Sequence, residues 1–311
     1  MFDTMDRPTQ IFGELKALLP HSVVRQDEPL AKRTTLRVGG RADVWLEPAS
    51  ENDLATAVRF CHQAATPFLI LGRGSNLLVR DGGIRGVVIC LSHPGFSRIE
   101  MERPYLRCGA GARLKAVSAK AREMELGGLE FLEGIPGSVG GALRMNAGAM
   151  GSAVLEMVTQ VRFMDRAGEV QEWEIAQVPS EYRSCPLFRE NIALGATFRG
   201  QPAAKEEISR RADNFNKKRW SSQPKEPSAG CIFKNPSPTL SAGKLIEELG
   251  LKGTRLGGAV ISTVHGNFIV NEGNATAHDV LQLIDVIQTR AKAERGIELR
   301  TEVEIIGEEL E

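Results

Sequence analysis

The chain of 311 residues is too long for one ordinary hydrophobic core and is a comfortable length for two domains. Lysine plus arginine and aspartate plus glutamate each number 39, and aromatic residues make up only 5%. This composition disfavours a nucleic-acid module and gives no general attraction to an anionic membrane. We therefore expect two domains, with any anion-binding site confined to a local cluster of residues.

Targeting and metal-binding signals are missing from the sequence. Residues 1–6 lack a basic stretch followed by an apolar one, and no run of about 18 apolar residues occurs. The five cysteines lack C-x-x-C spacing and the five histidines lack H-x-x-H spacing. The sequence therefore predicts a cytoplasmic protein without disulfides or a metal, although metal ligands far apart in the chain remain an alternative.

The first part of the chain alternates short apolar segments with amphipathic ones, the pattern of a mixed α/β or α+β protein. A helix is predicted at 51–64 after Ser50, a suitable N-cap, and a second helix at 114–124. A hairpin is predicted from residues 158–164 and 170–175, which flank a turn at 165–168. Further strands are predicted at residues 42–46, 68–71, 87–91 and 105–108.

A second, smaller α/β domain is predicted after a boundary near residues 200–202. A charged helix at 204–220 leads into it, and a long helix follows at 277–294. The remaining predicted segments are residues 244–249, residues 267–270 and a last strand at 298–306.

Two glycine-rich loops follow apolar segments in the first domain. Gly72-Arg73-Gly74-Ser75-Asn76 could gather backbone N–H groups around a phosphate, although in isolation such a pentapeptide is more often a plain tight turn. In residues 134–148, apolar residues alternate with glycines, as if a backbone were buried against a flat ligand. Neither loop has the P-loop or Rossmann pattern, so those folds are disfavoured.

The segment at residues 228–236 carries an acid, a cation and an amide together. A Gly turn there presents Cys231 beside Lys234 and Asn235, a grouping suited to protonating an anionic intermediate. Two distant candidates join it: the pair Tyr182-Arg183, and Glu302 in an apolar C-terminal run.

Each of these candidates also has a structural interpretation. A free cysteine is most often an inert small hydrophobe, and Cys61, Cys90 and Cys108 are interpreted so, while Cys185 stays ambiguous. By the residues alone, Cys231 is slightly more consistent with burial than with reactivity.

The other candidates have structural alternatives as well. Glu302 and Glu304 share one face of the predicted strand, so either could face water. Arg183 could be an ordinary surface arginine and Lys234 could extend from a strand edge. We expect His265 to be structural, hydrogen-bonded to backbone.

The chain resembles the family of UDP-N-acetylenolpyruvoylglucosamine reductases (MurB), flavoproteins of peptidoglycan precursor synthesis. The resemblance extends over about residues 30 to 307 and includes residues 242–247, Ser262 and residues 265–268 as well as the motifs above. It implies an α+β fold: an FAD-binding domain of the vanillyl-alcohol oxidase and p-cresol methylhydroxylase type, at 1–201, and a substrate domain at 202–311. The first domain would have two subdomains that divide near residues 95–105.

The resemblance also implies cofactors and site residues. FAD would be bound without a covalent bond, since no histidine lies in residues 72–80 or 134–151, and NADPH would donate hydride. The implied catalytic residues are Arg183, Cys231 and Glu302, and Tyr182, Lys234 and Asn235 would bind the UDP-sugar substrate. The implied cofactor residues are Gly72, Arg73, Gly74, Ser75, Asn76, Leu77, Gly134, Ile135, Pro136, Gly137, Ser138, Gly140, Gly141, Asn146, Ala147 and Gly148.

Cys231 departs from the family pattern, which has a serine as proton donor. A thiol, with an ordinary pKa of about 8.5, is a stronger acid than an alcohol and could donate a proton at neutral pH, but a nearby cation could leave it as a thiolate. About fifty residues separate Arg183 from Cys231, which predicts the shorter type of substrate lid and leaves the helix before Trp220 as a candidate cover.

We expect a monomer that serves cell-wall biogenesis, cell shape and cell division. A flavin oxidase of the same fold, and a catalytically silent FAD or nucleotide-sugar binding protein, remain the alternatives.

Overall fold

The computed structural model describes residues 6–310, so the prediction about targeting signals at the start of the chain lies almost wholly outside the described residues. Backbone contacts divide the chain into two compact units. Unit 1 comprises the described part of Met1–Gln26, with Val44–Arg73 and Gly86–Lys218, and unit 2 comprises Asp27–Asp43, Gly74–Arg85 and Arg219–Glu311, also where described. The expected domains, 1–201 for the cofactor and 202–311 for the substrate, are defined by the ligand that each would bind, whereas the two units are defined by backbone contacts. The expected domain limits therefore stay a prediction.

A first sheet has the strand order β1-β2-β5-β3, and its unit 1 part is covered by two helices. Helix α2 (Glu51–Gln63) begins as predicted, because the Ser50 side chain accepts a hydrogen bond from the N–H of Asp53. Helix α1 (Arg7–Leu18) was not predicted from the sequence. The apolar faces of α1 and α2 pack on β2 and β5. The strands are β1 (Val23–Pro29), β2 (Arg41–Glu47), β3 (Phe68–Ile70) and β5 (Ile84–Ile89).

The second sheet of unit 1 is antiparallel, with the order β12-β11-β13-β7-β6. The predicted hairpin at its edge is confirmed, because the Asp165 carboxylate accepts from the N–H groups of Ala167 and Glu169 and so closes the turn. Its strands are β6 (Ile99–Glu102), β7 (Tyr105–Gly109), β11 (Val158–Met164), β12 (Val170–Glu174) and β13 (Ile192–Arg199).

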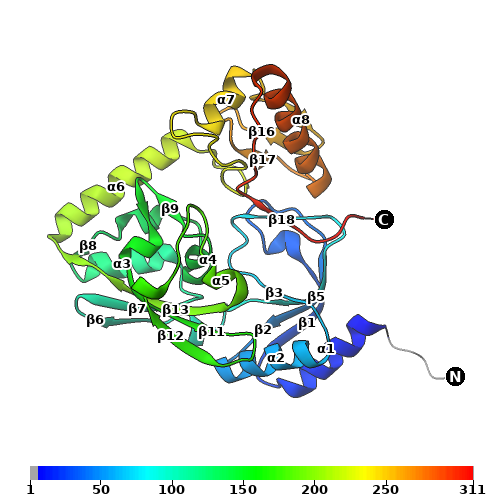
Figure 1. Ribbon diagram of the computed structural model, residues 1–311, viewed down its shortest axis with the longest axis vertical. Helices are drawn as coiled ribbons and strands as arrows, with labels where there is room; N and C mark the ends of the chain where they lie inside the picture. The colour runs from blue at the N-terminus through cyan, green and yellow to red at the C-terminus, as the bar shows by residue number, and fades with distance from the viewer. Residues whose placement is uncertain (1–5, 311) are drawn as a thin grey trace. The chain divides into compact units, whose positions relative to one another are not determined.

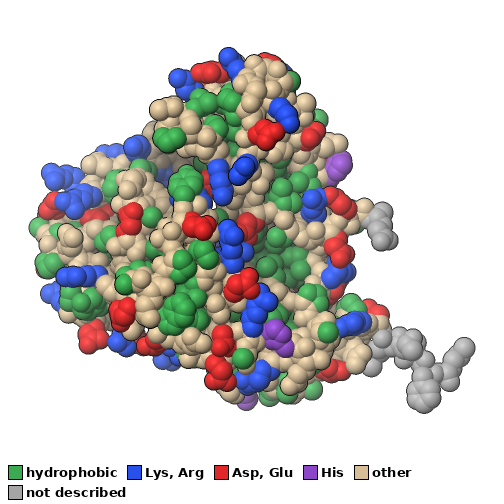
Figure 2. All heavy atoms as spheres, in the orientation of Figure 1, with side chains coloured by type: hydrophobic (Ala, Val, Ile, Leu, Met, Phe, Trp, Pro, Cys, Tyr) green, Lys and Arg blue, Asp and Glu red, His purple; other side chains and the backbone are tan. Residues whose placement is uncertain are grey.

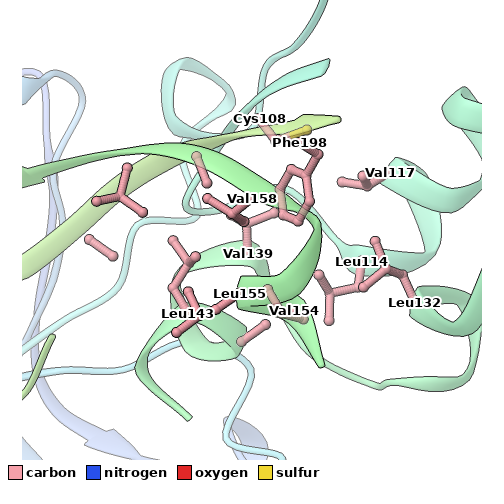
Figure 3. Packing of buried hydrophobic residues seen from close by; sticks show 14 of the residues in the cluster. Cys108, Leu114, Val117, Leu132, Val139, Leu143, Val154, Leu155, Val158 and Phe198 are labelled. Carbon is pink, nitrogen blue, oxygen red and sulfur yellow. The ribbon is translucent and has the colours of Figure 1, made fainter. Parts of the chain in front are cut away.

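Helices α3 (Leu114–Glu123) and α4 (Val139–Arg144) lie on one face of this second sheet (Figure 1). Figure 3 shows Leu114 and Val117 of α3 and Val139 of α4 in one apolar cluster with Val158 and Phe198 of the sheet. This packing gives α4, and with it the glycine-rich loop, a fixed support. The short elements of unit 1 are β8 (Leu126–Gly127), β9 (Gly148–Ala149), β10 (Ser152–Ala153), β14 (Gln201–Pro202) and α5 (Leu187–Glu190).

The predicted charged helix is α6 (Lys205–Ser222), and the division between the units falls within it, after Lys218. Acidic and basic side chains are interspersed on the face of the molecule shown in Figure 2, in keeping with the neutral composition. Within residues 6–310, no helix combines the length and the apolar character needed to cross a lipid bilayer.

Unit 2 surrounds the small antiparallel sheet β15-β16-β17 with α7 and α8 (Figure 1). Helix α8 (Ala277–Arg295) has strong signals at both ends: the Thr276 side chain accepts from the N–H of Asp279, and Gly296 ends the helix in the left-handed conformation at φ 66°. The other elements are β4 (Leu77–Val79), α7 (Ala242–Glu248), β15 (Arg255–Leu256), β16 (Ala259–Ile261), β17 (Ile269–Asn271) and β18 (Glu304–Ile306).

The predicted last strand at 298–306 is wrong in its extent, because β18 comprises only Glu304–Ile306, which pair in parallel with Leu77–Val79. The N–H groups of Glu302 and Val303 both point to the carbonyl oxygen of Ile232, at 2.7 and 3.4 Å, which bends the chain. Glu302 therefore precedes the strand, and the expected two-residue alternation with Glu304 does not apply.

Candidate active site

The two glycine-rich loops meet within unit 1. Gly72 follows strand β3, and a methyl group on it would lie 3.0 Å from the Ser138 Oγ and 3.9 Å from the Gly141 Cα. Arg73 beside it is exposed. The unit 1 part of the first predicted loop therefore lies directly against the second.

Backbone hydrogen bonds hold the middle of the second loop against residues 110–112. The N–H groups of Val139 and Gly140 donate to the carbonyl oxygens of Ala112 and Ala110, at 2.9 and 2.8 Å. This packing favours glycine at position 140, since a methyl group there would lie only 3.0 Å from the Ala110 Cβ.

At two other positions of the loop, the packing of the chain does not explain why the residue is glycine. A methyl group on Gly134 would meet nothing within 4 Å, and one on Gly141 would meet only the Ser138 Oγ at 3.7 Å. Neither glycine has a positive φ. The chain's own packing therefore does not demand glycine at these positions, whereas a flat ligand that approaches the backbone would demand it.

Arg183 lies in a tight turn beside the end of this loop. Glu181 and Ser184 exchange two backbone hydrogen bonds, at 2.9 and 3.2 Å, and Arg183 between them has φ 58°. Its Nη1 donates to the carbonyl oxygen of Gly148 at 3.1 Å, and a methyl group on Gly148 would lie 3.0 Å from that nitrogen. Gly148 therefore allows the close approach of the guanidinium.

Tyr182 gives the turn an exposed aromatic face. Its side chain is 64% exposed, and the Arg183 guanidinium carbon lies 5.3 Å from the ring centroid. A cation stacked on an aromatic ring keeps its charge and gains a preferred orientation. The pair can therefore present an oriented positive charge to an anionic ligand.

In unit 2, the Cys231 segment is held by backbone bonds. Gly230 has φ 78°, a left-handed conformation that glycine adopts without strain, so the predicted Gly turn before Cys231 is confirmed. The N–H of Ile232 donates to the Asn267 carbonyl oxygen at 2.9 Å, and the N–H of Lys234 donates to the Arg300 carbonyl oxygen at 2.9 Å. Ile232 is buried, whereas Cys231 and Lys234 are half-buried.

Glu302 is brought to the same segment by its backbone. Its N–H donates to Ile232, the next residue after Cys231, and its carbonyl oxygen accepts from the Asn76 Nδ2 at 3.1 Å. The N–H of Glu304 donates to the carbonyl oxygen of Asn76 at 3.0 Å. Unit 2 thus gathers three predicted site residues, Asn76, Cys231 and Glu302, and the Glu302 side chain is half-buried rather than exposed.

Asn235 has a structural bond that the sequence did not predict. Its side chain is exposed, and Oδ1 accepts from the N–H of Ala242, the first residue of α7, at 3.1 Å. The neighbouring predicted residues in the first loop, Gly74, Ser75 and Leu77, also lie in unit 2, with Leu77 paired to Glu304 in β4.

Asn267 supports the Cys231 segment, a role that was not predicted from the sequence. This buried side chain accepts from the N–H of Phe233 at 2.9 Å and donates to the Phe233 carbonyl oxygen at 2.8 Å, so it holds both polar groups of one residue in the Cys231 segment. The neighbouring His265 is structural, as expected: its Nδ1 accepts from the N–H of Asn267 at 3.1 Å, and burial lowers the pKa of its imidazole. The sequence feature that could have indicated this role is the position of Asn267, a polar residue at the start of the otherwise apolar segment 267–270.

The cysteines differ in environment. Cys61 and Cys108 are buried as expected, and burial raises the pKa of each thiol to about 12. Cys185 is also buried, and its thiol points to the Pro179 carbonyl oxygen at 3.4 Å, which settles its ambiguity in favour of packing. Cys90 is half-buried just after the end of strand β5, and its interpretation as an inert small hydrophobe stays a prediction.

Two protein-family models match separate parts of the chain. Residues 42–174 match a family model described as an FAD binding domain, and residues 223–306 match one described as the C-terminal domain of UDP-N-acetylenolpyruvoylglucosamine reductase. The expected α+β fold, an FAD-binding domain with the reductase C-terminal domain, is confirmed.

Curated relatives match over almost the full chain. The chain is 40% identical to the UDP-N-acetylenolpyruvoylglucosamine reductase of Geobacillus thermodenitrificans, over 98% of this chain and 100% of the relative. It is 43% identical to that of Geobacter metallireducens, over 96% of this chain and 99% of the relative.

A solved structure agrees with them. The crystal structure of the UDP-N-acetylenolpyruvylglucosamine reductase (MurB) from Thermus caldophilus superposes with a TM-score of 0.80 at 37% identity, over 91% of this chain and 99% of that chain. The chain belongs to the family of UDP-N-acetylenolpyruvoylglucosamine reductases.

Proposed function

We propose that this chain is the NADPH- and FAD-dependent reductase that converts UDP-N-acetylglucosamine enolpyruvate to UDP-N-acetylmuramate in peptidoglycan precursor synthesis. The observation that carries the proposal is the family relationship at about 40% identity over nearly the whole length of both chains. The local geometry supports it, since each unit holds a set of side chains suited to one part of this reduction.

FAD fits the residues of the glycine-rich loops. Gly134 and Gly141 leave their backbone open to a ligand without a packing reason of their own, and Gly72 with Ser138 brings the two loops together. The chemistry that bound FAD would supply there is hydride transfer, from NADPH to C3 of the enolpyruvyl group. The residues that would hold it are those predicted, Gly72 to Leu77, Gly134 to Ser138, Gly140, Gly141 and Asn146 to Gly148. With no histidine in residues 72–80 or 134–151, the cofactor is expected to dissociate when the protein unfolds.

Arg183 would stabilise the negative charge that develops at C2 and spreads into the substrate carboxylate. Its guanidinium is oriented in advance by the Gly148 carbonyl oxygen and by the ring of Tyr182. Donors fixed in advance cost no reorganisation when charge develops, and one such donor is typically worth about 10² to 10³ in rate.

Cys231 would deliver the proton from its Sγ to C2. The left-handed Gly230 before it and the Ile232 bond after it fix the direction in which the half-buried side chain leaves the backbone. Glu302 is the third catalytic candidate, held to the same segment through Ile232. Tyr182, Lys234 and Asn235 would bind the UDP-sugar.

The shorter lid, the domain limits at 201 and 202, a monomeric state and a cytoplasmic location complete the proposal. They rest on the spacing between Arg183 and Cys231, on chain length and on the family relationship. Gel filtration with light scattering tests the monomer, for which a mass near 33.9 kDa is expected.

The activity is tested by separating its two half-reactions. The purified, FAD-loaded protein is reduced anaerobically with NADPH, and UDP-N-acetylglucosamine enolpyruvate is then added while flavin absorbance is followed. Prompt reoxidation is expected, with UDP-N-acetylmuramate as the product. A flavin that stays reduced would reject the reductase, and peroxide formation on admission of oxygen with an alcohol substrate would favour an oxidase.

A further inference from the structure

The turn that carries Arg183 receives a side-chain hydrogen bond from Asn146 of the glycine-rich loop. Nδ2 of Asn146 donates to the carbonyl oxygen of Glu181, the first residue of the turn, at 3.2 Å, and Oδ1 accepts from the N–H of Leu155 at 3.2 Å. We propose that Asn146 is a positioning residue that fixes the place of the Arg183 guanidinium through this turn. The proposal rests on the proposed reductase function, in which Asn146 was expected only to contact FAD.

The conformation of the turn explains why such a support is needed. Arg183 has φ 58°, in the left-handed region that residues with a long side chain seldom occupy, so the surrounding structure must hold it there. Asn146 itself has φ 39°, and asparagine is among the residues that tolerate this region best. An asparagine can therefore adopt the required backbone shape and supply the support at once.

The neighbouring bonds depend on the path of the same loop. The N–H of Cys185, just after the turn, donates to the carbonyl oxygen of Arg144 at 3.0 Å, and Arg183 itself donates to Gly148 at 3.1 Å. Asn146 lies between these two loop residues. Three hydrogen bonds thus join residues 144–148 to the turn and to Cys185, the residue after it. The Asn146 bond is the one made to Glu181, where the turn begins.

The chemistry of the carboxamide makes the proposal specific. One end of asparagine donates and the other accepts, which is what the Glu181 carbonyl oxygen and the Leu155 N–H require. Aspartate has the same shape, but its ionised carboxylate has only acceptors. Asn146→Asp therefore places a carboxylate oxygen against the Glu181 carbonyl oxygen, while the other carboxylate oxygen still accepts from the Leu155 N–H. The substitution loosens the turn without leaving a cavity.

Asn191→Asp is a matched control. Asn191 is also in unit 1, and its Nδ2 donates to the Leu187 carbonyl oxygen at 2.9 Å, so the same change of charge removes the same kind of bond. This bond is local and does not involve the turn.

The first test compares the two half-reactions in stopped flow with FAD-loaded protein. For Asn146→Asp we expect reoxidation by UDP-N-acetylglucosamine enolpyruvate to slow by about 10- to 100-fold more than flavin reduction at saturating NADPH slows, since misplacing a reacting group by an ångström costs rates of this order. Asn191→Asp should leave both rates within about twofold.

A double-mutant cycle separates positioning from general damage. If Asn146 acts through Arg183, adding Asn146→Asp to Arg183→Ala should slow reoxidation by no more than about twofold further. A loss as large as that in the parent background would overturn the proposal, as would normal reoxidation in Asn146→Asp. Equal slowing of both half-reactions with weakened FAD binding would make Asn146 a cofactor ligand only and would also overturn it.

The second test needs no flavin chemistry. Hydrogen exchange of the peptide covering residues 181–185 is measured by mass spectrometry in the full chain without added cofactor. The bonded amides of Glu181 and Ser184 should exchange about five- to tenfold faster in Asn146→Asp and unchanged in Asn191→Asp. Unchanged protection in Asn146→Asp would contradict the proposal.

A parent protein whose reduced flavin is not reoxidised by substrate would reject the proposed function, and this proposal with it.

Discussion

The loop and turn that carry Arg183 in unit 1, and the segment that carries Cys231 in unit 2, present their side chains by different means. In unit 1, Asn146 and Arg183 both have positive φ, and hydrogen bonds of their side chains link them to the surrounding chain. In unit 2, the backbone around Cys231 is bonded on one side to Asn267 and on the other to residues 300–303. The first region is shaped by unusual local conformations and the second by strand-like neighbours.

The two regions should therefore tolerate different substitutions. Backbone bonds in unit 2 do not depend on the identity of the presented side chain, so Cys231 can be exchanged with little effect on its support. In unit 1 the presented Arg183 is itself part of the support, because its guanidinium bonds Gly148. The predictions below test this contrast.

Replacing Cys231 should give the largest effect on rate. General acid catalysis contributes typically about 10² to 10⁴, so we expect Cys231→Ala to slow flavin reoxidation by substrate to that extent. Cys231→Ser should retain activity, since its hydroxyl occupies the same place. Single-turnover reoxidation measures both variants, and normal turnover in Cys231→Ala would remove Cys231 as proton donor.

Replacing Arg183 should cost about 10² to 10³ in the same step. Arg183→Lys should recover only part of this loss, because the lysine ammonium lacks the planar fork that reaches Gly148 while facing the substrate. If the lysine variant matched the parent in single-turnover rate, charge alone would suffice and the bond to Gly148 would have no catalytic role.

Removing the support in unit 2 should lower stability more than it changes chemistry. Asn267→Ala leaves the buried N–H and carbonyl oxygen of Phe233 without these partners, which should lower the free energy of unfolding by about 3 kcal/mol. Asn235→Ala, which loses one exposed bond at the start of α7, should cost about 1 kcal/mol or less. Urea unfolding compares the two, and equal costs would mean that Asn267 is not the main support.

Two glycines of the same loop should respond differently to alanine. Gly140→Ala would force a methyl group to 3.0 Å from the Ala110 Cβ and should lower stability by about 1 to 2 kcal/mol. Gly134→Ala meets open space, so its urea midpoint should stay unchanged while FAD binds about tenfold more weakly. Flavin fluorescence titration measures the affinity, and normal FAD binding by Gly134→Ala would show that this space does not serve the cofactor.

His265 should give the smallest effect, visible only as a function of pH. Its pKa is lowered in the folded state by burial, so the unfolded chain binds more protons as the pH falls below about 6.5. The stability contributed by the neutral ring is therefore present above that pH and lost as the pH falls toward the folded pKa. His265→Asn, which keeps an acceptor for the Asn267 N–H, should flatten the pH dependence of the melting temperature between pH 7 and 5. An unchanged slope would assign that dependence to other groups.

Much of the fold was predictable because its signals are local. Ser50 caps α2, the turn after Met164 closes on Asp165, and Gly296 ends α8, and in each case the residue's own chemistry acts within a few positions of the chain. The last strand was overestimated because Glu302 and Val303 are bent by Ile232, a residue far away in sequence. Helix α1 was missed, and its buried residues Ile11 and Leu15 face a core built from later segments.

By itself the sequence determined the classes of chemistry available to this protein: a thiol after a left-handed glycine, a cation beside a tyrosine, and glycine-rich loops suited to a flat cofactor. It could not determine which side chains hold these groups in place. Asn267 and Asn146 form their bonds to residues 233 and 181, which are 34 and 35 positions away. Only the tertiary structure decides such partners, because a hydrogen bond depends on distance and direction in space, and both are set by the packing of the whole unit.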